Sequence, residues 1–264
     1  MPACEFSQAG TYKMLHLSKI MSFTILLLAF FIACSKSDTI VDTNNEELQL
    51  ISSNKINVSE ASGLTINASG STLFAVSDNT SNIYELATDG TVIKEYIYEG
   101  NDVEGISMVS NNKVLLVEER TKEIVEYDLS TKNYNKHKVI YNNSDSNSGL
   151  EGVAFNLNDN TIFVVNEKNP GLLMRLRSDF SIIESYELDF ASDYSGIFHD
   201  KELNILWILS DESKTLNKCS LKGVLIKSYS INVIKAEGIA VTNNTIYIVS
   251  DSNSTLYEFK KPIE

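Results

Sequence analysis

Three glutamates in this sequence each stand directly before a glycine that opens an apolar stretch. They are Glu104, Glu151 and Glu237, in the stretches EGISM, EGVAF and EGIAV, and Ser62 and Ser195 hold the same place in SGLTI and SGIFH. If these five stretches are structurally equivalent, three carboxylates and two hydroxyls converge on one place. Converging carboxylates either have raised pKa values or enclose a cation. The chemistry expected of this set is therefore the binding of a hard cation.

Calcium is the cation that such an oxygen-rich set favours, because Ca²⁺ takes about six to eight oxygen ligands in flexible geometry. The predicted ligands are Glu104, Glu151 and Glu237, with Glu60, Ser62 and Ser195 as further candidates. In the alternative interpretation, the three glutamates face solvent at a channel mouth or accept hydrogen bonds from backbone amides.

The glycines that follow these residues recur with the period of a repeat protein. They are Gly63, Gly105, Gly152, Gly196 and Gly238, spaced by 42, 47, 44 and 42 residues. Each is followed by a continuous apolar run, such as LFAVSDN or IYIVSDS, which is typical of a strand buried on both faces. Third and fourth strand-like stretches follow in most copies. Four short strands per repeat predict the blade of a β-propeller.

An acidic residue ends each of these apolar runs, 13 to 15 positions after the glycine. The series is Asp78, Glu119, Glu167, Asp211 and Asp251. A carboxylate at the end of a buried strand can cap the backbone amides of the following turn. We therefore interpret this second series as structural.

The predicted fold class is all-β, a five-bladed β-propeller over residues 47–264. The fifth repeat ends after its third strand, and the stretch LQLISSNKI, residues 48–56, precedes the first glycine motif. If this N-terminal strand completes the last blade, it closes the ring and hides its edges. The alternative is an open sandwich with internal similarity.

Residues 1–33 are predicted to be a lipoprotein-type signal peptide. A segment with Lys13 and Lys19 precedes the apolar run MSFTILLLAFFIA, which is too short to span a bilayer as a helix but suits a signal-peptide core. Met14 or Met21 is an alternative start of this leader.

The run ends in FIAC, which resembles a lipobox, so Cys34 is predicted to be lipidated. Residues 34–46 are polar and predict a tether between a membrane and the propeller. A conventional signal peptide with an incidental Cys34 is the alternative. Beyond Cys34 the only cysteine is Cys219, so no disulfide framework is expected.

Removal of the leader takes away Lys13, Lys19 and Glu5, which leaves 20 basic and 34 acidic residues, a net charge of −14. Such a charge repels polyanions and attracts cations. Nucleic acid is therefore not an expected partner. We expect a monomer in the bacterial cell envelope, anchored on the extracytoplasmic side of the inner or outer membrane.

Seven stretches occur in a characteristic order: EASGL, DVEGIS, GLEGVAF, VVNEKNP, DYSGIF, WILSDES and AEGIAV. In this combination, residues 47–264 resemble the SdiA-regulated, YjiK-like family of bacterial envelope β-propeller proteins, which is distantly similar to NHL repeats. The resemblance implies a five-bladed propeller with a bound calcium, carried onto Glu104, Glu151 and Glu237. It implies no settled activity.

Two functions remain open from the sequence. The first is a non-enzymatic, lipid-anchored propeller whose calcium stabilises the axis and whose loops bind a protein or envelope ligand. The absence of a G-x-S-x-G nucleophile motif favours it. The second is a calcium-dependent hydrolase, either a lactonase or esterase or a phytase-like phosphatase, in which the cation acts as a Lewis acid. Fold analogy alone does not establish that chemistry.

Few side chains could support catalysis or a zinc site, and no catalytic residue is assigned. Zinc is not expected, since His137, His199 and Cys219 lie at no spacing typical of a zinc site. His199, three residues after Gly196, could serve as a general base if its strand turned it into the channel, and packing is its alternative role.

Overall fold

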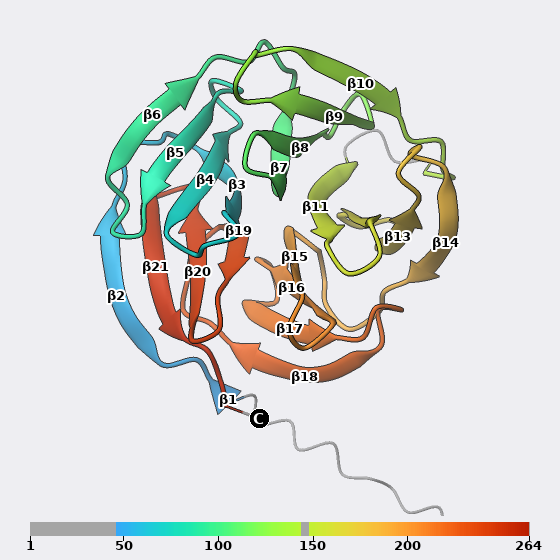
Figure 1. Ribbon diagram of the computed structural model, residues 1–264. Helices are drawn as coiled ribbons and strands as arrows, with labels where there is room; N and C mark the ends of the chain where they lie inside the picture. Colours follow the sequence, from blue (N-terminus) through green and yellow to red (C-terminus); the bar gives the residue numbers. More distant parts are fainter. Residues whose placement is uncertain (1–45, 144–147, 264) are drawn as a thin grey trace, which may run out of the picture. The chain divides into compact units, whose positions relative to one another are not determined.

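The computed structural model describes residues 46–143 and 148–263, and all the regular structure in this part is β-strand. Five small sheets lie side by side around one axis (Figure 1). The predicted five-bladed β-propeller is confirmed. No helix in the described ranges could cross a membrane. The predicted leader and the lipidated Cys34 lie outside them.

Each blade is an antiparallel sheet whose strands run from the axis outward in chain order. The first comprises β3 (Ala61–Ile66), β4 (Thr72–Ser77), β5 (Ile83–Ala87) and β6 (Val92–Tyr96). The second comprises β7 (Val103–Ser110), β8 (Lys113–Glu118), β9 (Glu123–Asp128) and β10 (Tyr134–Lys138). The third comprises β11 (Leu150–Asn156), β12 (Thr161–Asn166), β13 (Leu172–Leu176) and β14 (Ile182–Glu187).

The fourth blade comprises β15 (Gly196–Asp200), β16 (Ile205–Ser210), β17 (Thr215–Cys219) and β18 (Leu225–Ser230). The fifth comprises β19 (Ala236–Val241), β20 (Thr245–Ser250) and β21 (Thr255–Lys260), completed by β2 (Leu50–Lys55).

The N-terminal strand closes the ring as expected. Strand β2 pairs antiparallel with β21, so the two ends of the chain share the fifth blade (Figure 1). One further strand was not expected: β1 (Glu46–Glu47) pairs parallel with β18 of the fourth blade. The N-terminal segment therefore links two neighbouring blades, and its first described residue, Glu46, already lies in a strand.

The hydrophobic core lies between adjacent blades rather than inside one layer. Successive residues of a strand face opposite sides of the sheet. In β12, Ile162 and Val164 therefore pack toward the second blade, whereas Phe163 and Val165 pack toward the fourth. Because both faces of the second strand are covered, its sequence is a continuous apolar run instead of an alternating one.

The inner strands approach one another most closely at the repeated glycines. A Cβ on Gly63 would lie 2.9 Å from Cα of Gly105, and a Cβ on Gly105 would lie 3.0 Å from Cα of Gly152. The backbone beside Gly238 meets that of Gly63 in the same way. These contacts leave a space of only about 10 Å³ on the axis, which is close to the volume of one water-sized probe. We call the circle of Gly63, Gly105, Gly152, Gly196 and Gly238 around the axis the glycine ring. It separates two larger cavities at the opposite ends of the inner strands.

Candidate functional site

An acidic cavity of about 220 Å³ lies at the end of the axis where the inner strands begin. All three predicted glutamates line it, together with the other three predicted ligand candidates. The lining residues are Glu60, Ser62, Asp78, Glu104, Glu151, Glu167, Lys168, Asp193, Ser195, Asp211, Glu212, Lys235, Glu237 and Asp251. The repeat thus brings the pre-glycine residues of all five blades into one space.

Glu104 is part of a close group of three carboxylates. Its partners are Asp78, at the end of β4 in the first blade, and Asp102, in the turn before β7. One oxygen of each residue lies within 4.8 Å of one oxygen of the other two. Arg120 forms an ion pair with Asp102, with 2.7 Å between Nε and Oδ2. We call these three carboxylates the Glu104 triad.

Glu151 is part of a second group with the same spacing. It meets Glu119, at the end of β8, and Glu167, at the end of β12. A Cβ on Gly149 would lie 2.7 Å from Cγ of Glu119, so the absence of a side chain at Gly149 makes room for that glutamate. Lys168 Nζ lies 2.6 Å from Glu167 Oε1. We call Glu119, Glu151 and Glu167 the Glu151 triad.

Two carboxylates of each triad resist ionisation, namely Glu104 and Asp78 in the first and Glu151 and Glu119 in the second. Burial, followed by the neighbouring Asp78 and Asp102 charges, raises the pKa of Glu104 to about 9. Burial and the charges of Glu104 and Glu119 raise the pKa of Glu151 well above its usual value. Burial is also the main cause that raises the pKa of Glu119 to about 7 and that of Asp78 to about 6. Without a compensating cation, Glu104 and Glu151 therefore hold protons near neutral pH.

Glu237 lies in the same cavity but among different neighbours. Burial raises its pKa to about 8, while the nearby Lys235 opposes the shift. Lys235 Nζ also lies 3.6 Å from Asp211 Oδ2. Among the described carboxylates, the close groups of three contain Glu104 and Glu151 but not Glu237. The strongest concentration of carboxylates is thus on the side of the first three blades.

Ser62 and Ser195 use their hydroxyl protons to join neighbouring blades. Ser62 Oγ donates to the backbone oxygen of Val103, and Ser195 Oγ donates to that of Ala236, each at 2.6 Å. Both serines are buried. Each acceptor stands two residues before the glycine of the next blade, so the two bonds are equivalent links between inner strands.

A family model described as SdiA-regulated matches residues 40–260. The chain belongs to the SdiA-regulated family.

Solved structures share the fold of this SdiA-regulated chain at low sequence identity. A glutaminyl cyclase from Myxococcus xanthus has a TM-score of 0.63 and 11% identity, over 83% of this chain and 100% of the other. A luciferin-regenerating enzyme has a TM-score of 0.52 and 12% identity, over 80% of this chain and 95% of the other. A nidogen–laminin complex has a TM-score of 0.53 and 10% identity, over 72% of each chain. These similarities concern the fold alone.

The second acidic series of this SdiA-regulated protein follows the buried strands as expected, but it does not have the predicted capping role. Its members contribute to the acidic cavity and to both triads. The contacts with the following turn are instead made by the preceding residue: Ser77 Oγ accepts from Thr80 N, and Ser210 Oγ accepts from Ser213 N, each at 3.1 Å. The residue before each of these two acidic residues, Ser77 or Ser210, therefore caps the turn. The acidic series itself belongs to the cavity.

A third series, three residues before each glycine, was missed apart from Glu60. Its members are Glu60, Asp102, Gly149, Asp193 and Lys235. Glu60, Asp102 and Lys235 have positive φ angles of 46°, 61° and 52°. Their backbone oxygens accept the amides of Asp78, Glu119 and Asp251 at 2.9 to 3.0 Å. Alignment of the five repeats on their glycines was the signal that could have found this series.

His199 does not lie with the carboxylates. It lines the larger cavity on the other side of the glycine ring, is 5% exposed, and its ring lies 6.4 Å from that of Phe163. Its Nε2 lies 3.3 Å from Asn204 Oδ1. Of the basic residues in the third blade, Lys168 lines the acidic cavity. Arg175 does not line it and instead forms an ion pair with Asp159, with 2.6 Å between Nη2 and Oδ2.

Proposed function

We propose that this protein is a calcium-binding, lipid-anchored propeller that serves as a binding module in the cell envelope. The observation that supports calcium most directly is the pair of carboxylate triads around Glu104 and Glu151. The lipid anchor rests on the sequence around Cys34.

The spacing of the triads suits calcium. Oxygens bound to one Ca²⁺ at about 2.4 Å can lie at most about 4.8 Å apart, and one oxygen from each triad member meets this limit. The donors are hard carboxylate oxygens, and the described residues of the cavity include no histidine or cysteine. This donor set favours calcium over zinc.

The charge of each triad also suits a divalent ion. Three ionised carboxylates face one basic partner, which is Arg120 in the Glu104 triad and Lys168 in the Glu151 triad. Each group then carries a formal charge of −2. A bound Ca²⁺ would offset this charge and lower the raised pKa values, so binding would release protons.

The position of His199 argues against a hydrolase in which this histidine is the general base at the proposed calcium. A hydrolase that used the proposed calcium as a Lewis acid would need its base near the same cavity. The glycine ring separates His199 from the carboxylates. Lys168, which could face an anionic substrate, is paired with Glu167 and Glu212 at 2.6 and 3.0 Å.

The proposal is tested by thermal unfolding of the purified protein in calcium and in EDTA. Calcium at about a hundred times its dissociation constant stabilises the folded state by about 2.7 kcal/mol. For a domain of this size, the expected rise in Tm is about 5–10 °C. Isothermal titration then gives the number of bound ions.

Glu151→Gln separates the metal from the fold. A glutamine resembles the protonated glutamate, so the variant in EDTA should melt at or above the temperature of the unchanged protein. In calcium it should gain little. Glu187→Gln, at an exposed position of β14, is the matched control and should keep the full rise. A calcium-dependent rise that survives in both Glu104→Gln and Glu151→Gln would refute the assignment of the ion to these triads.

A further inference from the structure

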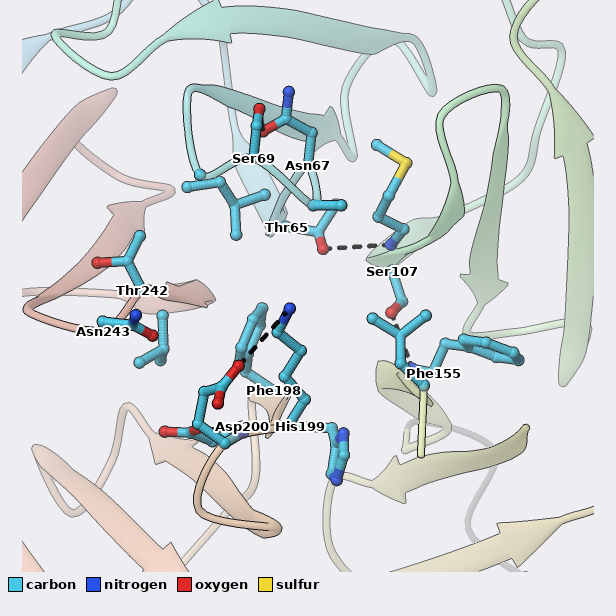
Figure 2. Close-up of a pocket in the computed structure, with 18 of the residues that line it drawn as sticks. Thr65, Asn67, Ser69, Ser107, Phe155, Phe198, His199, Asp200, Thr242 and Asn243 are labelled. Atoms are coloured by element: carbon cyan, nitrogen blue, oxygen red, sulfur yellow. Dashed lines mark hydrogen bonds and ion pairs between the residues drawn. The ribbon is translucent and has the colours of Figure 1, made fainter. Parts of the chain in front are cut away.

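The cavity on the other side of the glycine ring has a volume of about 470 Å³. This volume falls in the range of roughly 300–1,000 Å³ that is typical of small-molecule sites. Its walls are the ends of the inner strands and the hairpin turns that follow them (Figure 2). No residue of the carboxylate triads takes part in it.

The floor of this cavity is asymmetric. The position two residues after the repeated glycine is occupied, in blade order, by Thr65, Ser107, Ala154, Phe198 and Ala240. Of these, Thr65, Ser107 and Phe198 line the cavity. The first and second blades thus present hydroxyls, and the fourth blade presents an aromatic ring. In a five-membered ring the fourth blade faces the gap between the first two. Figure 2 shows Thr65 and Ser107 along one side of the cavity and Phe198 along the other.

The two hydroxyls are buried donors without an acceptor. Thr65 Oγ1 accepts from Met108 N at 3.2 Å, and Ser107 Oγ accepts from Phe155 N at 2.8 Å. Thr65 is 3% exposed and Ser107 is 7% exposed. These hydrogen bonds from backbone amides hold the two hydroxyl oxygens in place and use only the oxygen lone pairs. In the described part of the chain neither hydroxyl proton has an acceptor, so both can donate to a ligand.

His199 supplies a complementary acceptor. Its Nδ1 is buried and has no hydrogen-bond partner among the described residues. Burial lowers the pKa of His199, so the ring is neutral near pH 7. If Nε2 donates to Asn204, the Nδ1 lone pair is free to accept a proton donor. Leaving such a buried atom unpaired would cost about 1–3 kcal/mol.

The charged groups around the cavity are paired with one another. Asp200 accepts from Lys261 at 2.5 Å and from Trp207 Nε1 at 3.2 Å. Lys201 lies 3.7 Å from Glu202. The net charge of the chain, −13, also disfavours anions. A neutral ligand suits this lining best.

We infer that this cavity binds a neutral sugar, a monosaccharide or disaccharide unit. One sugar hydroxyl or ring oxygen accepts from Thr65 and Ser107, another hydroxyl donates to His199 Nδ1, and the C–H face of the ring packs on Phe198. Polar side chains at the rim extend the hydrogen bonding (Figure 2). They are Asn67, Ser69, Thr242 and Asn243. Sugars combine donors, acceptors and an apolar face without charge, which is the combination this lining presents.

The test uses the purified full-length protein and a panel of glucose, galactose, N-acetylglucosamine, maltose and lactose. Saturation-transfer NMR detects binding, and titration gives the dissociation constant. At least one sugar should bind. Thr65→Val and Phe198→Leu should each weaken it by about tenfold or more, the loss of about 1.4 kcal/mol. Thr65→Ser, which keeps the hydroxyl, should bind as before, and Glu187→Gln, at an exposed position of the outer strand β14, is the control.

Three results would overturn the inference. The first is no binding by any sugar in the panel. The second is that Phe198→Leu and Thr65→Val both bind the sugar as tightly as the unchanged protein does, each with an unchanged melting temperature. The third is binding that EDTA or Glu151→Gln abolishes while the protein stays folded, because the sugar would then lie in the acidic cavity. If Thr65→Val does not fold, sugar-induced chemical-shift changes at the Thr65 methyl and the Phe198 ring decide between binding and no binding here.

Discussion

Gly105 and Gly152 meet backbone to backbone on the propeller axis. A Cβ on Gly105 would lie 3.0 Å from Cα of Gly152 and 2.9 Å from the backbone oxygen of Glu151. Backbone cannot move aside as a flexible side chain can. The same contact that narrows the channel also brings Glu104 and Glu151 into the lining of one cavity.

Gly105→Ala is therefore expected to destabilise the whole propeller. Overpacking against a rigid core costs about 1–3 kcal/mol or more. Urea unfolding should show this loss, whereas Gly70→Asn should be nearly neutral, because Gly70 lies in an open turn with a φ of 72° that asparagine tolerates. Equal stability of Gly105→Ala and the unchanged protein would contradict the close packing of the inner strands.

Ser62→Ala and Ser195→Ala should affect stability without affecting calcium. Each removes a buried hydrogen bond to the next blade, donated to the carbonyl of Val103 or of Ala236. The expected cost is about 1–3 kcal/mol in the free energy of unfolding. Calcium titration of both variants should give the affinity of the unchanged protein. A tenfold weaker affinity in either variant would make that serine a ligand.

The metal-free protein should become less stable as the pH rises. The folded-state pKa values of Glu104 and Glu237, about 9 and 8, lie above the usual value of 4.5. Such groups contribute stability that is fully present below pH 4.5 and is lost as the pH rises through 8 and 9. In EDTA, the melting temperature should therefore fall between pH 6 and pH 9.

Calcium should oppose this fall, because it favours the ionised carboxylates. Its stabilising effect should be larger at pH 8.5 than at pH 6, and binding should release protons in a weakly buffered titration. A melting temperature in EDTA that rises from pH 6 to pH 9 would contradict the raised pKa values.

Lys261→Met should lower the free energy of unfolding, because it leaves the buried Asp200 carboxylate without its cationic partner. Lys261, just after β21, is 9% exposed and pairs with Asp200, which is 4% exposed. Burial raises the pKa of Asp200, but hydrogen bonds from Lys261 and Trp207 outweigh this effect and hold the pKa below its usual value. Removing one partner of a buried pair costs about 3–5 kcal/mol. The fluorescence of Trp207, the single tryptophan, should report the lower urea midpoint.

The loss should shrink on acidification, since a protonated Asp200 needs no cationic partner. Asp200→Asn combined with Lys261→Met should recover part of the stability at pH 7. If Lys261→Met is as stable as the unchanged protein, the ion pair does not join the C-terminal segment to the fourth blade.

The blade count and the closure of the ring could be predicted because both leave local marks. The glycine recurs at each inner strand where the backbones touch, and the second strand is apolar on both faces because neighbouring blades cover it. Strand β1 left no such mark. Two residues that pair with an exposed edge need no particular side chain, so the sequence gives no sign of this strand, and Glu46 was predicted to end the tether.

The sequence by itself determined the five-bladed architecture and the convergence of the pre-glycine glutamates, since both follow from a repeat whose units are equivalent. Only the tertiary structure decided which carboxylates meet: Glu104 with Asp78 and Asp102, and Glu151 with Glu119 and Glu167, but not all three predicted glutamates in one close group. It also placed His199 beyond the glycine ring. The reason is physical: spacing along the chain sets which strand carries a residue, whereas the distance between two side chains depends on the packing of different blades.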